Sequence, residues 1–124
     1  CTHHQGDREK QEKTTQINGL HMRMLAYYLG KLQETQDGDG SLLDHSMIMY
    51  GASLSDANLH LYTDLSLVLV AGGVKGIKGG MHVKYPKRTP MTNLLLTMLD
   101  TAGVPHVEKL GDSTGRLTLP TLSA

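Results

Sequence analysis

Three histidines and one aspartate are the side chains in this sequence best suited to bind a metal ion. His3 and His4 lie near the start of the 124-residue chain, and Asp56 and His60 lie in a polar stretch after the apolar run 47–50. Imidazole and carboxylate groups are suitable ligands for borderline divalent metals. Open α/β folds place their chemistry where a buried strand ends. These four residues are therefore the candidates for a divalent-metal site.

The spacing of these residues leaves alternative roles open. Asp56 and His60 are four residues apart, so they can converge on one ion if the backbone curls. His3 and His4 are adjacent and point to opposite faces in an extended strand, which favours one ligand and one supporting residue. Asp56 could equally cap a turn, and His60 could equally be a plain surface residue.

Composition excludes several classes of function. Twelve basic and twelve acidic residues balance, and the chain has no Trp and no Phe. Neither a strong field nor a base-stacking surface points to nucleic acid, so no such partner is expected. No apolar run reaches the roughly 18 residues of a membrane span, and the single Cys1 cannot form an internal disulfide. The length allows one domain, 1–124, with a modest core.

Periodicity predicts two helices that flank the candidate site. Residues 8–34 carry an apolar stripe at helical spacing, with Asp7 as the N-cap, and we expect the stripe, Tyr27 and Tyr28 to pack in the core. A second helix is expected to begin with Thr89 as cap and Pro90 in its first position, and to end at Gly103 and Pro105. Its expected buried face consists of Leu95, Met98, Leu99 and Ala102.

Two continuous apolar runs, 47–50 and 65–71, predict strands that are covered on both faces. The stretch 37–41 has the Asp-x-Asp-x-Ser spacing of a calcium loop, but Leu42 and Ile48 occupy two positions where that loop needs Gly and an acidic residue. A turn is the better interpretation. The glycine-rich stretch 72–80 fits a surface loop better than a phosphate cradle. Together these elements indicate an α/β layer fold.

Separated sequence blocks resemble the HXXSHH family of bacterial proteins of unknown function. The blocks are His3-His4-Gln5-Gly6-Asp7, the run 37–44, Ser46-Met47, Tyr50-Gly51, 55–60, Ala71-Gly72-Gly73, 78–80, His82, Tyr85-Pro86, Thr89-Pro90, 93–97, Leu99-Asp100, 103–105 and 111–115. They occur in the family's order over nearly the whole chain. The resemblance implies that this chain is the C-terminal part of a longer domain and that an N-terminal part of the same protein precedes it.

That family in turn resembles the alkaline phosphatase and sulfatase group, which implies a partial alkaline-phosphatase-like sheet with flanking helices. It also implies a hydrolase that depends on a divalent metal, with zinc as the candidate ion, and acts on phosphate or sulfate esters, either of small molecules or of polysaccharides. Asp56 matches the group's loop aspartate, and His60 matches a following histidine. His3 and His4 would be ligands from an earlier motif, and the nucleophile would lie outside this chain. The resemblance further implies export to the periplasm or cell surface.

Two departures favour a second interpretation. This chain has Tyr62 where the family usually has a second histidine, and Ser66 where it usually has proline. Losing an imidazole reduces the number of available ligands. The alternative function is therefore a non-catalytic, exported binding or surface protein that retains the fold.

Overall fold

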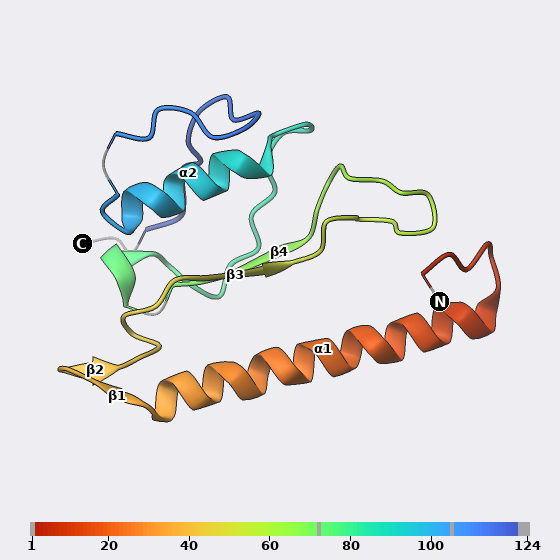
Figure 1. Cartoon of the computed structure of the whole chain (residues 1–124), viewed down its shortest axis with the longest axis horizontal. Coiled ribbons are helices and arrows are strands. Elements are labelled where there is room, and N and C mark those ends of the chain that lie inside the picture. Colours follow the sequence, from red (N-terminus) through yellow and green to blue (C-terminus); the bar gives the residue numbers. More distant parts are fainter. Residues whose placement is uncertain (1, 72, 105, 122–124) are drawn as a thin grey trace.

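The computed structural model describes residues 2–71, 73–104 and 106–121. The elements follow in the order α1 (Arg8–Glu34), β1 (Gln36–Asp37), β2 (Gly40–Ser41), β3 (Ile48–Gly51), β4 (Leu67–Val70), the 3-10 helix η1 (Val74–Gly76) and α2 (Met91–Thr101) (Figure 1). β1 pairs with β2 and β3 pairs with β4, and both pairs are antiparallel. Helices combined with small sheets are consistent with the general α/β class.

Helix α1 begins and ends close to the predicted residues. Asp7 is the N-cap, and its Oδ1 accepts a hydrogen bond from the backbone N–H of Lys10 at 3.1 Å. The helix ends at Glu34, where the N–H of the C-cap Thr35 donates to the carbonyl oxygen of Leu32. The chain then forms the β1–β2 hairpin, in which Gly38 has a φ of +59°. The predicted turn at 37–41 is therefore a hairpin.

The apolar stripe of α1 is exposed, so the prediction that it packs in the core is wrong. Leu20 is 49% exposed, Met24 60%, Tyr27 69% and Tyr28 50%. The helix lies apart from α2 and the β3–β4 pair and contacts the hairpin at its C-terminal end (Figure 1). The accessible surface of the chain is 9123 Å², whereas a compact monomer of this mass exposes about 6,500 Å². The excess reflects this uncovered helix.

The two predicted strands form, but they are not covered on both faces. β3 and β4 pair from Ile48 opposite Val70 to Gly51 opposite Leu67. The residues of β3 are at most half-buried, and Val68 on β4 is 40% exposed. Among the described residues neither α1 nor α2 makes an extensive contact with this pair, and α1 stands away from it (Figure 1). A Cβ at Gly51 would collide with the end of the Leu67 side chain, so a larger residue there would require that side chain to move.

The small core is centred on α2. Leu96 is fully buried, and Leu94 and Ala71 are 7% and 8% exposed. The buried face therefore contains Leu94 and Leu96 instead of the predicted set, in which Leu95, Met98 and Leu99 are half-buried and Ala102 is exposed. The face is displaced because the C-terminal segment 110–117 packs on the side of α2 that carries Asn93 and Thr97.

The predicted start of α2 is wrong by one residue, and its predicted end at Gly103 is confirmed, while Pro105 lies outside the described residues. Pro90 is the N-cap and not the first helical residue, and the Thr89 hydroxyl donates to the carbonyl oxygen of Pro86 at 2.7 Å. Gly103 has a φ of +79°, and the N–H groups of Gly103 and Val104 donate to the carbonyl oxygens of Asp100 and Leu99. This is a Schellman ending, so the predicted glycine stop is confirmed.

Candidate metal centre

The structure brings His3 and His60 into direct contact across 57 residues of sequence. Their Nε2 atoms are 3.0 Å apart, and the ring centroids are 4.6 Å apart with the planes nearly perpendicular. Metal–nitrogen bonds of about 2.0–2.1 Å place two imidazole nitrogens about 2.9 Å apart at a right angle and about 3.3 Å apart at the tetrahedral angle. The observed separation lies within that span, and it is also the length of a hydrogen bond in which one ring donates its Nε2 proton to the other. Binding of an ion between the rings would replace that proton.

A closed loop presents His60 to His3. The N–H of Ser55 donates to the carbonyl oxygen of Leu61 at 2.8 Å, and the N–H of Leu61 donates to that of Asp56 at 2.9 Å. The Asp56 Oδ1 accepts hydrogen bonds from the N–H groups of Asn58 and Leu59, at 2.8 and 3.0 Å. Asp56 thus builds the turn, which was one of its two expected roles.

The backbone of His60 is held in the left-handed region, with a φ of +54°. This conformation costs a non-glycine residue about 1–2 kcal/mol, and such outliers are concentrated at functional sites. Gln5, next to the His3-His4 pair, also has a positive φ, of +49°. Both sides of the imidazole pair therefore carry backbone strain, and this supports a functional reading of the contact.

His4 has a different environment from His3. Its Nδ1 lies 3.1 Å from the N–H of Gly6, which donates to it, and 3.3 Å from Nε2 of Gln11. A neutral imidazole that accepts at Nδ1 carries its proton on Nε2 and has no lone pair left for a metal. In this geometry His4 fixes the turn before α1 and His3 faces His60.

Asn58 and Gln5 also belong to the site, and sequence reasoning missed them. The Asn58 Oδ1 accepts a hydrogen bond from the backbone N–H of Gln5 at 2.8 Å, which ties the two histidine-bearing segments together. No spacing rule could have found this contact, because the residues are 53 positions apart. The only signal was that both lie within blocks that resemble the same family.

The pair lacks a third ligand. Within residues 2–71, 73–104 and 106–121, no three His, Cys, Asp or Glu side chains are grouped so that they could hold a metal ion. Catalytic zinc sites use three protein ligands and a water molecule. Two imidazoles can therefore begin a metal centre but do not complete one. Cys1 lies outside the described residues.

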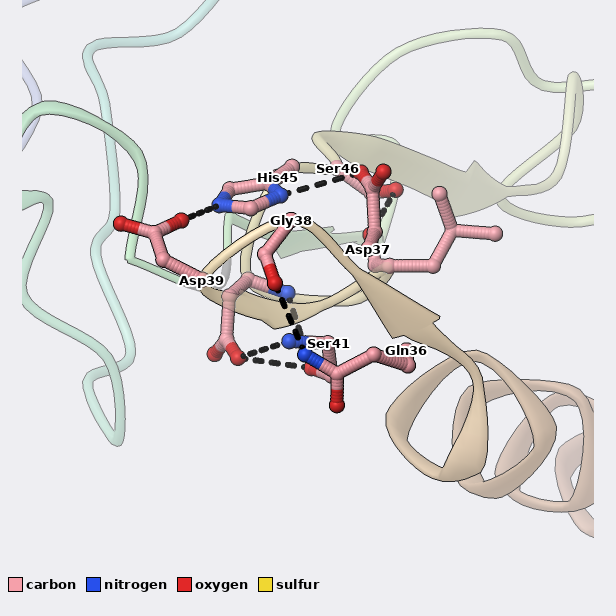
Figure 2. Close-up of polar contacts among 9 residues, drawn as sticks. Gln36, Asp37, Gly38, Asp39, Ser41, His45 and Ser46 are labelled. Carbon is pink, nitrogen blue, oxygen red and sulfur yellow. Dashed lines mark hydrogen bonds and ion pairs between the residues drawn. The ribbon is translucent and has the colours of Figure 1, made fainter.

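A second histidine, His45, lies between two carboxylates of the β1–β2 hairpin. Figure 2 shows its ring flanked by Asp37 and Asp39, with Nδ1 3.0 Å from Asp37 Oδ2 and Nε2 3.3 Å from Asp39 Oδ1. The hydrogen bond to Asp37 raises the pKa of His45, with smaller contributions from the charges of Asp37, Asp39 and Asp44. These contacts favour the protonated form of His45, which can donate to both carboxylates of the stretch that has partial calcium-loop spacing.

The hairpin should be pH-dependent through His45. Because the folded pKa is raised, the stabilisation is complete below the unfolded pKa of about 6.5 and is lost as pH rises through the folded value. An NMR titration of the imidazole should show a larger fall in the His45 pKa for Asp37→Asn than for Asp39→Asn, whose side chain is 97% exposed. A His45 pKa that neither substitution changes would contradict this assignment.

Compared with known proteins, the chain matches no family model, no curated protein and no solved structure. The resemblance to the HXXSHH family accordingly depends on the sequence blocks quoted above. Neither helix in the described part of the chain is long and apolar enough to cross a membrane.

Proposed function

We propose that this chain contributes to a divalent-metal centre, with zinc as the candidate ion, in a hydrolase-like protein of the HXXSHH type that acts on phosphate or sulfate esters. The observation that carries the proposal is the Nε2–Nε2 separation of 3.0 Å between His3 and His60. A bound divalent ion would lower the pKa of a coordinated water and neutralise charge on the transferring group. In this proposal the sheet belongs to an alkaline-phosphatase-like fold, and the location is the periplasm or cell surface.

The roles of the four predicted residues follow from their contacts. His3 and His60 are proposed as ligands, and His4 as the residue that positions the first segment. Asp56 has one oxygen, Oδ1, in the turn that presents His60. Its Oδ2 makes no hydrogen bond among the described residues and is the oxygen that could turn toward an ion.

The proposal is tested by zinc titration against a chromogenic chelator. His3→Ala and His60→Ala should each weaken zinc binding at least a hundredfold, since a lost ligand costs more than the roughly 10- to 100-fold typical of a lost supporting residue. Asp56→Asn keeps the Oδ1 acceptor and therefore the turn, so it isolates the ligand role of the carboxylate. A loss as large as that of His60→Ala would make Asp56 a ligand, and unchanged affinity would make it a turn residue.

The matched control is His21→Ala, which removes an exposed imidazole from the middle of α1. It should leave zinc affinity unchanged. If all three histidine variants bind zinc as the parent does, or if the parent binds none, the metal centre is refuted.

A non-catalytic binding protein is the second candidate, and one observation favours it. Tyr62, at the position where the family usually has a histidine, is 77% exposed and has no side-chain hydrogen bond within the described residues. Hydrolysis of p-nitrophenyl phosphate and p-nitrophenyl sulfate by the zinc-loaded protein separates the candidates. Zinc binding without hydrolysis of either ester would favour the binding protein.

A further inference from the structure

The basic residues of this chain are unevenly distributed. Between Asp64 and Asp100 the sequence contains five basic residues and no acidic one. The other seven basic residues share the rest of the chain with all twelve acidic residues. Net neutrality therefore conceals a positively charged region, most of which lies in the segment 78–88, here called the basic segment.

The cations of the basic segment are exposed and unpaired. Lys78, Lys84, Lys87 and Arg88 are all exposed and form no side-chain hydrogen bond or ion pair within the described residues. On α1, by contrast, three of the five cations, those of Arg8, Lys13 and Lys31, are each paired with a glutamate three or four residues away. The positive charge of the basic segment is thus not neutralised by the protein itself.

The basic segment is also held in place. The backbone N–H of Lys78 donates to the carbonyl oxygen of Pro120 at 2.9 Å, and Ile77 forms a β-bridge with Thr121. The Tyr85 hydroxyl donates to the carbonyl oxygen of Thr118 at 2.9 Å. The segment follows η1 and leads to the start of α2 (Figure 1). The two contacts within the segment, at Lys78 and Tyr85, reduce the conformational entropy that is lost when a ligand binds it.

We propose that the basic segment binds a linear anionic polysaccharide. Its cations are spread along eleven residues, which suits a polymer with repeated negative charges, whereas a small anion needs donors that converge on one point. Nucleic acid is disfavoured, because the chain has no Trp or Phe and the segment has a single aromatic residue, Tyr85, for base stacking. This binding surface is distinct from the histidine pair and does not depend on it.

The test measures binding of labelled dextran sulfate and hyaluronate in low salt, with a chelator present so that metal plays no part. Lys78→Gln, Lys84→Gln and Lys87→Gln are combined in one variant. Its matched control combines Lys10→Gln, Arg23→Gln and Lys109→Gln, which remove the same charge from exposed side chains that form no ion pair in the described chain. Arg88 is left unchanged because its φ is +64°.

The variant of the basic segment should bind at least about tenfold more weakly than the parent, and the control less than about threefold more weakly, with parent binding weakened as salt rises. Binding of dextran sulfate alone would show that the segment recognises sulfate groups. Binding of both polymers would show that it recognises anionic groups in general. Equal losses in the two variants, no binding by the parent, or equally tight binding of oligothymidine would each overturn the proposal. Zinc affinity, measured separately, should be the same in all three proteins.

Discussion

Replacing Leu96 with alanine is expected to destabilise the α2 core by about 3 kcal/mol, and this is the largest stability effect we predict. Leu96 is the one large side chain of the described residues that is fully buried. Deleting its isobutyl group removes buried apolar surface and leaves a cavity, which costs about 2–5 kcal/mol in other proteins. Among the described residues, the only other buried apolar residues are Leu94 and Ala71, so few side chains are available to fill the cavity.

The measurement should report on α2 and not on α1. Helix α1 is the longer of the two helices and has no buried residues, so circular dichroism would mainly follow a helix that does not share this core. Native-state hydrogen exchange of the α2 amides gives the local opening free energy. Leu20→Ala, at a position 49% exposed on α1, is the matched control and should leave α2 protection unchanged. Equal α2 protection in the Leu96→Ala variant and the parent would contradict this core.

Replacing Asn93 with alanine is expected to cost about 2 kcal/mol and to release the C-terminal segment. Asn93 is 5% exposed, its Oδ1 accepts from the Thr114 N–H at 2.8 Å, and its Nδ2 donates to the Thr114 Oγ1 at 3.1 Å. Removing one amide leaves a partly buried N–H and a hydroxyl without their partner. A buried donor left without a partner costs about 1–3 kcal/mol.

Hydrogen exchange also tests this second effect, at the amide of Thr114. The matched control is Thr92→Val, which removes the neighbouring bond from the Thr92 hydroxyl to Asp112, an exposed bond of 2.6 Å. The control should change protection by less than about 1 kcal/mol, because water can replace an exposed bond. If Thr92→Val releases the segment as much as Asn93→Ala, burial of the amide is not what holds it.

Local signals in the sequence predicted the elements well. Asp7 caps α1 and Gly103 ends α2 as expected, because capping depends on a few adjacent residues. The apolar runs became β3 and β4 for the same reason. Sequence periodicity could not say which face of each helix is covered. That depends on the partner, and α1 has little packing, whereas α2 is packed by a segment with no periodicity of its own.

The candidate site was predicted in part. Residue type and family resemblance selected His3, His4, Asp56 and His60, and the structure pairs two of them, His3 and His60. Sequence spacing could not tell the ligands from the supporting residues. That distinction depends on the His4 Nδ1, which accepts a backbone hydrogen bond, and on the Asp56 Oδ1, which accepts the hydrogen bonds of a turn. His45 could not be placed between two carboxylates without knowing that 36–41 forms a hairpin.

The length of α1 has a consequence for the imidazole pair. A helix of 27 residues is about 40 Å long, and its C-terminal end is anchored to the hairpin by the N–H groups of Leu42 and Leu43. The length of α1 therefore sets the distance between the hairpin and His3, which contacts His60. Substitutions on the exposed surface of α1 leave this distance unchanged. Inserting or deleting a single residue would rotate His3 by about 100° around the helix axis. The position of His3 therefore depends on the number of residues in α1 and not on the chemistry of its exposed side chains.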